Sequence, residues 1–192
     1  RSAHIATGMP GSTAAETTAI QDILVEDGKF ISIAPNFKAT LEAQGKDMAS
    51  VEVVDLGGKL VCPPFCDTHL HLDYVFTARK PGAVNESGTL FEGIQRWSET
   101  KADLTVDEIK ERAKIGIAKE MRHGVQFIRS HADVTDPNLT SLKALLELKE
   151  ELKDTVTLQI VSFPQEGMYS YEGPHGESGA DLVEEGLKMG EI

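Results

Sequence analysis

Two histidines at alternate positions are the residues of this chain best suited to chemistry. His69 and His71 lie in the segment VCPPFCDTHLHLD. On a strand, alternate side chains share one face, so both imidazoles would converge on one point. Imidazole suits zinc, iron, nickel and copper, and a catalytic site adds further ligands while leaving one position for water. The spacing therefore predicts half of a catalytic metal site, with Asp73 on the same face.

The alternative interpretation is a chance pair of histidines on an exposed strand, and the spacing alone favours it. Three features favour the metal site. The intervening Leu70 and Leu72 are apolar and would face covering helices, Asp73 follows at the same spacing, and the strand opens a repeat of strands and helices.

The chain after Val61 alternates between short apolar strands and amphipathic helices, which indicates a parallel α/β architecture. We expect strands over 61–73, 125–134 and 155–164, and helices over 89–101, 104–124, 137–154 and 179–190. The helix over 104–124 has the clearest limits, because Thr105 and Glu108 form a capping-box pattern and Gly124 supplies a C-terminal cap.

Three strand–helix units in succession predict the first half of a (β/α)8 TIM-type barrel over residues 61–192. Active sites of such barrels lie at the carboxyl ends of the strands, where His69 and His71 fall. A closed barrel needs roughly 250 residues. The chain ends at Ile192, so we expect an incomplete barrel.

Residues 1–60 have a different pattern, typical of a small antiparallel β-unit. Strands over 20–35 flank Asp27-Gly28, and strands over 51–61 flank Gly57-Gly58, so two hairpins are expected. The polar stretch 37–50 between them is interpreted as a helical turn or a loop.

The composition of the chain argues against two classes of binding partner. The net charge is 19 − 31 = −12, which disfavours nucleic acid and anionic membranes. No apolar run is long enough to span a bilayer, and the polar opening residues do not resemble a secretory signal. Cys62 and Cys66 lie too close in sequence for a disulfide between them to stabilise a domain. Reduced thiols and a cytoplasmic location are therefore expected.

Four segments carry a resemblance to a known family. HLHLD at 69–73, SGTLFEGIQRW at 87–97, SHADV at 130–134 and LQIVSFPQEG at 158–167 resemble, in order and spacing, the N-terminal half of the amidohydrolase superfamily. They are most similar to bacterial cytosine deaminase and its close relatives. This resemblance implies that residues 1–60 belong to a small β-sandwich built around the barrel.

The resemblance also implies roles for individual residues. His69 and His71 would bind one divalent metal ion, iron or zinc. Gln165 would hold the amide edge of the substrate, since a primary amide offers both a donor and an acceptor. Without the resemblance, Gln165 is better interpreted as a loop-capping amide after Pro164. Leu90 would offer backbone groups to the substrate.

Three further residues are candidates for supporting the metal ligands. His131 and Asp133 alternate near the end of the second strand, and Asp73 follows the first. Structural roles are favoured for His131 and Asp133, and His131 is the candidate for orienting a ligand. The general acid and base, and the remaining ligands, are expected beyond Ile192.

The implied activity is hydrolytic deamination of an aminopyrimidine or cyclic amidine by metal-activated hydroxide, with cytosine yielding uracil and ammonia. Isocytosine, creatinine and triazines remain alternative substrates. A catalytically inactive barrel fragment or binding protein is the alternative from another class. A small-molecule substrate and a homo-oligomer are the expected partners.

Overall fold

The computed structural model describes residues 3–5 and 20–190. The chain divides into two compact units, Arg1–Pro63 and Pro64–Ile192, and each is described by itself. The predictions about the opening segment 6–19 and about the chain end at Ile192 lie outside the described residues.

The N-terminal unit contains a four-stranded sheet in the order β3-β2-β1-β4. Its strands are β1 (Ala3–Ile5), β2 (Ile20–Glu26), β3 (Lys29–Ala34) and β4 (Leu60–Val61). The predicted hairpin between β2 and β3 is confirmed, and its two turn residues, Asp27 and Gly28, both have positive φ angles, as a tight hairpin turn requires. The polar stretch forms α2 (Phe37–Ala43) and the short 3-10 helix η1 (Met48–Ser50).

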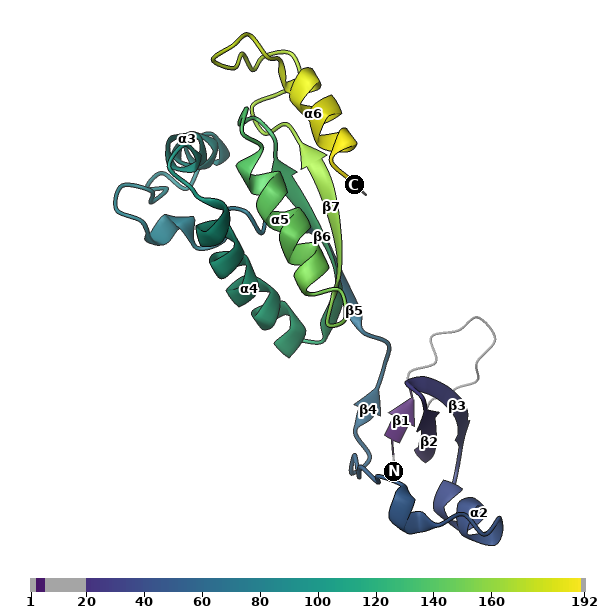
Figure 1. Ribbon diagram of the computed structural model, residues 1–192. Helices are drawn as coiled ribbons and strands as arrows, with labels where there is room; N and C mark the ends of the chain where they lie inside the picture. The colour runs from purple at the N-terminus through teal and green to yellow at the C-terminus, as the bar shows by residue number, and fades with distance from the viewer. Residues whose placement is uncertain (1–2, 6–19, 191–192) are drawn as a thin grey trace. The chain divides into compact units, whose positions relative to one another are not determined.

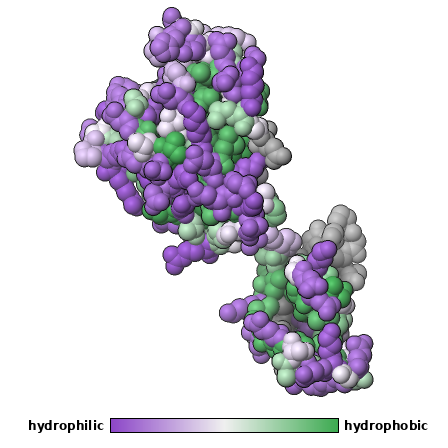
Figure 2. All heavy atoms as spheres, in the orientation of Figure 1, coloured by the Kyte–Doolittle hydropathy of each residue, from purple (hydrophilic) through white to green (hydrophobic). Residues whose placement is uncertain are grey.

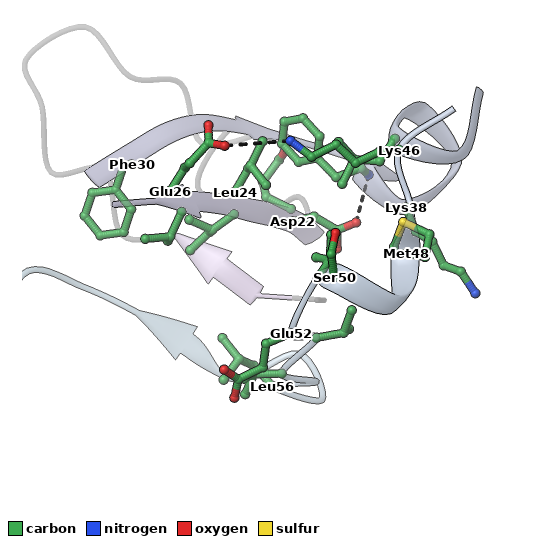
Figure 3. A pocket seen from close by; sticks show the side chains of 18 of the residues that line it. Asp22, Leu24, Glu26, Phe30, Lys38, Lys46, Met48, Ser50, Glu52 and Leu56 are labelled. Atoms are coloured by element: carbon green, nitrogen blue, oxygen red, sulfur yellow. Dashed lines mark hydrogen bonds and ion pairs between the residues drawn. The ribbon is translucent and has the colours of Figure 1, made fainter. Parts of the chain in front are cut away.

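The second predicted hairpin, around Gly57-Gly58, is wrong. Residues 51–59 contain no strand, and β4 pairs in parallel with β1 instead of folding back on the preceding residues. Val53 and Val54 are therefore left exposed, and with β2 they line a hollow of about 650 Å³ (Figure 3). The described residues of this unit form a single sheet, so the β-sandwich stays a prediction.

The C-terminal unit is a mixed α/β structure with a parallel sheet in the order β5-β6-β7 (Figure 1). Its strands are β5 (Phe65–Leu70), β6 (Val125–Asp133) and β7 (Thr157–Phe163). The predicted helices are present as α3 (Leu90–Lys101), α4 (Val106–Arg122), α5 (Thr140–Glu151) and α6 (Gly179–Lys188), and a 3-10 helix, η2 (Thr77–Arg79), follows β5.

The hydrophobic core of this unit lies between the sheet and its helices. The helix α5 packs against β6 and β7, α4 packs against α5 and β6, and α6 packs against β7. Ile128 and Ile160 from the strands meet a buried face of α5 formed by Leu142, Leu145 and Leu148. Each such side chain contributes about 1.5–3 kcal/mol by leaving water, which fixes the sheet whose strand ends carry the candidate site.

The helix α4 forms as the sequence predicts. The Thr105 hydroxyl and the Glu108 carboxylate complete a reciprocal capping box at its N-terminus. Ile109, Ala113 and Ile117 recur at four-residue intervals and are buried, so the apolar stripe faces the core. Gly124, with φ of 87°, ends the helix and leads into β6.

The strand that carries His69 is shorter than the sequence predicts. The strand β5 ends at Leu70, so His71 and Asp73 follow the strand and do not lie within it. The backbone N–H of Leu72 donates to the hydroxyl of Ser130, 3.0 Å away. Since that donor meets a side chain and not a carbonyl of β6, the backbone ladder stops before His71.

Candidate active site at the carboxyl ends of the strands

Three histidines gather where β5 and β6 end. The ring centroids of His69 and His71 are 5.3 Å apart in an edge-on arrangement, and the ring of His131 stacks on His69 at 4.1 Å. His69 is exposed, while His71 and His131 are half-buried. The two predicted ligands therefore lie close together even though only His69 is within the strand.

His71 is oriented by the neighbouring strand. Its Nδ1 lies 3.0 Å from the carbonyl oxygen of His131, so Nδ1 carries the proton and donates to that oxygen. Nε2 is then the nitrogen with a free lone pair, the tautomer that a metal ligand requires. Burial lowers the pKa of His71, with the His131 and His69 imidazoles adding to the effect, and this favours the neutral ring that binds metal.

These residues fit part of a metal centre. Two imidazoles supply two of the ligands of a transition-metal site. Within residues 3–5 and 20–190, no group of three or more His, Cys, Asp or Glu side chains is arranged to hold a metal ion. His131 contacts His71 through its backbone carbonyl, whereas its ring packs on His69. An orienting role for the His131 side chain stays a prediction.

A pocket of about 790 Å³ opens beside His71. It brings together three residues from separate segments that the sequence analysis singled out: His71 after β5, Leu90 at the start of α3, and Gln165 after β7. Tyr74 and Trp97 complete this side of the wall. The other predicted site residues, His69, His131, Asp73 and Asp133, do not line this pocket.

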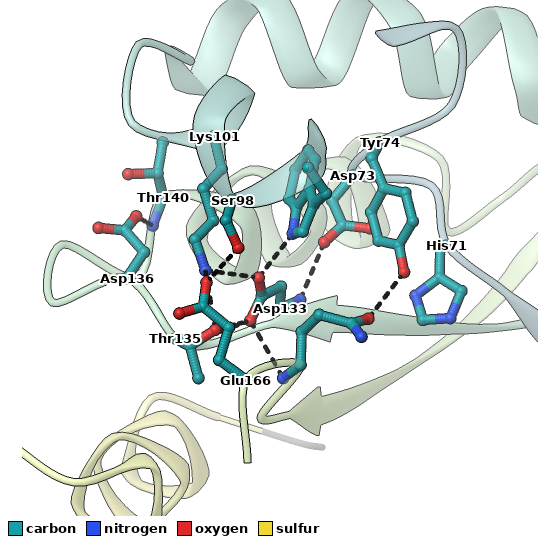
Figure 4. Close-up of polar contacts among 12 residues, drawn as sticks. His71, Asp73, Tyr74, Ser98, Lys101, Asp133, Thr135, Asp136, Thr140 and Glu166 are labelled. Carbon is teal, nitrogen blue, oxygen red and sulfur yellow. Dashed lines mark hydrogen bonds and ion pairs between the residues drawn. The ribbon is translucent and has the colours of Figure 1, made fainter. Parts of the chain in front are cut away.

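Tyr74 contacts three other lining residues. Its hydroxyl donates to Oε1 of Gln165 over 3.0 Å (Figure 4). Its ring stacks on Trp97 at 4.4 Å between centroids and lies 4.6 Å from the ring of His71. Burial, with the carboxylates of Asp73 and Asp133 nearby, raises the pKa of Tyr74 above its ordinary value, so the phenol stays protonated and donates.

Asp73 and Asp133 connect the segment after β5 with the end of β6. Asp73 is fully buried, and its Oδ2 accepts the backbone N–H of Asp133 over 2.9 Å. Burial raises the pKa of Asp73 to about 7. This hydrogen bond ties the segment after His71 to the end of β6, which makes Asp73 a structural link between the two strands.

The carboxylate of Asp133 joins the end of β6 to α3 (Figure 4). Its Oδ2 accepts from Nε1 of Trp97 over 2.6 Å and from Nζ of Lys101 over 3.0 Å. Its Oδ1 accepts from the backbone N–H and the hydroxyl of Thr135, at 2.8 and 2.6 Å. Asp133 is 1% exposed, so this buried charge is balanced by a cation and several donors.

Lys101 extends the same network to the segment that carries Gln165. Its Nζ lies 2.5 Å from Oε1 of Glu166 and 2.8 Å from the hydroxyl of Thr135. Ser98 also donates to Glu166 over 2.7 Å. Glu166 therefore contacts α3 while Gln165 lines the pocket. The two residues lie at the centre of a turn, which the N–H of Gly167 closes by donating to the carbonyl oxygen of Pro164 over 2.9 Å.

Sequence reasoning missed Tyr74 and Lys101. Tyr74 stands three residues after His71, immediately after HLHLD, and that position was the available signal. Lys101 lies in the last turn of α3, where a cation suits the helix dipole in any helix. Its contacts with Asp133 and Glu166 span more than thirty residues of sequence and leave no local pattern.

Comparison with known proteins identifies the family of this chain. The model of the amidohydrolase family matches residues 52–185. The chain belongs to the amidohydrolase family. Among curated amidohydrolase relatives, N-isopropylammelide isopropyl amidohydrolase of Pseudomonas sp. (strain ADP) is 30% identical over 80% of this chain and 37% of its own length. Pterin deaminase of Rhizobium rhizogenes is 28% identical over 77% of this chain and 32% of its own length.

A solved structure is similar over nearly the whole chain. The 5-methylcytosine deaminase of Klebsiella pneumoniae, liganded with 5-fluorocytosine, matches with a TM-score of 0.74 and 36% identity, covering 99% of this chain and 41% of that one. This amidohydrolase chain thus spans between about a third and two fifths of the length of these relatives. No helix in the described residues is long and apolar enough to cross a membrane.

Proposed function

We propose that this chain forms part of a metal-dependent hydrolytic deaminase of aminopyrimidines, with cytosine as the substrate. The observation that carries the proposal is the shared pocket, because His71, Leu90 and Gln165 come from three segments and line one cavity. The similarity to a 5-methylcytosine deaminase supports the choice of substrate class.

The pocket residues and the neighbouring His69 have side chains suited to this activity. His69 and His71 would hold the metal ion, which supplies activation of water at neutral pH when bound. The amide of Gln165 would pair with the carbonyl and ring nitrogen edge of the pyrimidine. Tyr74 and Trp97 would exclude water along one wall of the pocket.

We also propose that residues 61–192 are the N-terminal half of a (β/α)8 barrel and that residues 1–60 are part of a β-sandwich. The three parallel strands with their covering helices support the first proposal. The hollow with exposed Val53 and Val54 is compatible with a second layer over the sheet of the N-terminal unit.

Ammonia release from a panel of substrates tests the activity. The complete gene product, loaded with iron or zinc, should deaminate cytosine faster than isocytosine and creatinine. Turnover of creatinine or isocytosine alone would move the assignment to that substrate. A metal-loaded protein that releases ammonia from none of them would overturn the deaminase proposal and favour a binding protein.

Metal analysis tests the ligand assignment independently of turnover. The purified gene product should contain about one transition-metal ion per chain, and replacing both His69 and His71 by alanine should remove most of it, since each ligand lost weakens binding. His175→Ala is the matched control, because His175 lies exposed in the segment between β7 and α6. Undiminished metal in the double variant would contradict the assignment.

A further inference from the structure

Tyr74 is held in place by its aromatic neighbours and by Arg112. Its ring is stacked on Trp97 at 4.4 Å between centroids and lies tilted beside His71 at 4.6 Å. The guanidinium of Arg112, on α4, donates to the carbonyl oxygens on either side of Tyr74, those of Asp73 and Val75, at 3.0 and 2.7 Å. The hydroxyl of Tyr74 thus has a fixed position before any ligand enters.

The hydroxyl of Tyr74 contacts the amide of Gln165 in one of the two orientations that an amide can take. A primary amide has one acceptor oxygen and one NH2 group, and turning it by half a revolution exchanges them. Tyr74 donates to Oε1 of Gln165 over 3.0 Å. The oxygen is therefore kept on the Tyr74 side, and the NH2 group is directed away from Tyr74.

We propose that Tyr74 is a specificity-determining residue that fixes the donor and acceptor ends of the Gln165 amide, and so selects heterocycles whose carbonyl oxygen meets the NH2 group. The inference rests on the proposed function, because Gln165 must contact the substrate. It goes further by specifying the orientation in which a pyrimidinone is bound.

Cytosine and isocytosine are suitable probes because their carbonyl and amino groups occupy exchanged ring positions. A fixed amide can match only one of them well. Tyr74→Phe removes the hydroxyl and keeps the ring between Trp97 and His71, so the amide becomes free to turn. The preference between the two probes in kcat/KM should then fall about threefold to tenfold, the worth of one hydrogen bond, with most of the change in KM.

Two further variants distinguish this role from a general structural effect. Tyr169→Phe removes the same atom from a tyrosine that is 86% exposed, and should leave the preference unchanged. In a Gln165→Ala background, Tyr74→Phe should no longer alter the preference, because the group it orients is gone. An equal effect with and without Gln165, or a preference that stays within twofold in Tyr74→Phe, overturns the inference.

Equilibrium binding of the two probes, measured by calorimetry on the metal-loaded gene product, separates this inference from the proposed function. A parent protein that binds one probe preferentially and deaminates neither refutes the deaminase and leaves the inference standing, provided Tyr74→Phe reduces the binding preference. A parent that deaminates cytosine while Tyr74→Phe keeps its preference refutes the inference alone. A parent that binds neither probe refutes both.

Discussion

At the scale of single residues, the site depends on polar groups that do not line the pocket beside His71. Asp133 is the clearest case, since its buried carboxylate accepts hydrogen bonds from Trp97 and Lys101 of α3 and from Thr135. These bonds connect the helix that begins at Leu90 to the end of β6. The position of Trp97 in the pocket wall therefore depends on the buried carboxylate of Asp133, which does not line the pocket.

Asp133→Ala should lower the free energy of unfolding by about 3–5 kcal/mol, because Trp97 Nε1 and the Lys101 ammonium lose a buried partner. Urea denaturation measures the change. Asp103→Ala, an exposed aspartate between α3 and α4, should stay within about 0.5 kcal/mol. In the Asp133→Ala background, Lys101→Met should cost less than it does alone, and strictly additive effects would contradict the coupling.

Residue types and spacing predicted a part of this site. The nearness of His69 and His71 follows from strand periodicity, which holds one residue beyond the end of β5. A structural role was expected for Asp133, but the hydrogen-bond partners of Tyr74, Lys101 and Asp133 could not be predicted, because they are 91, 65 and 36 residues away in sequence. Hydrogen bonds at such separations depend on the folded topology and produce no periodic signal.

At the scale of elements, the start of α3 is fixed by its own first turn. Thr89 caps the helix by accepting the N–H of Glu92. The Glu92 carboxylate in turn accepts the N–H groups of Glu86 and Ser87, at 3.1 and 2.6 Å. Because Leu90 follows Thr89, this local network also places a pocket-lining residue.

The carboxylate of Glu92 should titrate far below its ordinary range. Hydrogen bonds from Ser87, through its side chain and N–H, and from the N–H of Glu86 lower the pKa of Glu92 from 4.5 to about 2. The ionised form stabilises the fold, so this stabilisation is complete above about pH 4.5 and is lost as the pH falls through 2.

NMR titration checks this value directly. The amide proton shifts of Glu86 and Ser87 should change with a midpoint near pH 2, the pKa of Glu92, and that change should vanish in Glu92→Gln. Glu99→Gln removes the same charge from a later turn of α3 and should leave these two shifts unaltered. A midpoint near 4.5, the ordinary value for glutamate, would show that the hydrogen bonds do not form.

The predicted limits of helices and strands were right where contacts between residues close in sequence set them. They were wrong where strand pairing sets them. The capping box of α4 involves Thr105 and Glu108, which are three residues apart, so it was visible in the sequence. The hairpin expected around Gly57-Gly58 failed because β4 pairs with β1, more than fifty residues earlier. Alternation of apolar residues indicates a strand only where a partner strand is available.

At the scale of the whole molecule, the two units differ in how much apolar surface they bury. Leu41 is the one buried apolar residue among the described residues of Arg1–Pro63, whereas the extended core lies in Pro64–Ile192. The N-terminal unit exposes large apolar side chains, including Phe30, Val53 and Val54, and Figure 2 shows hydrophobic residues at its surface. Its stability within this chain should be the lower of the two.

Denaturant should therefore unfold the N-terminal unit first. Trp97 is the only tryptophan of the sequence and is buried in the C-terminal unit, so its fluorescence reports that unit alone. Protection of the β2 and β3 amides from hydrogen exchange should be lost at lower urea than the fluorescence transition. Coincident transitions would show instead that the two units unfold as one cooperative structure.

The hydrogen bond from His71 Nδ1 to the carbonyl of His131 has a consequence for folding. It lies one step beyond the pairing of Leu70 with Ser130, so a side chain continues the contact between β5 and β6 where the backbone ladder ends. A slip of one residue would displace that carbonyl by about 3.3 Å and break the bond. The His71 imidazole therefore has the orientation proposed for metal binding only in a correctly registered sheet. One hydrogen bond thus depends on the register of the strands and sets the orientation of the proposed ligand.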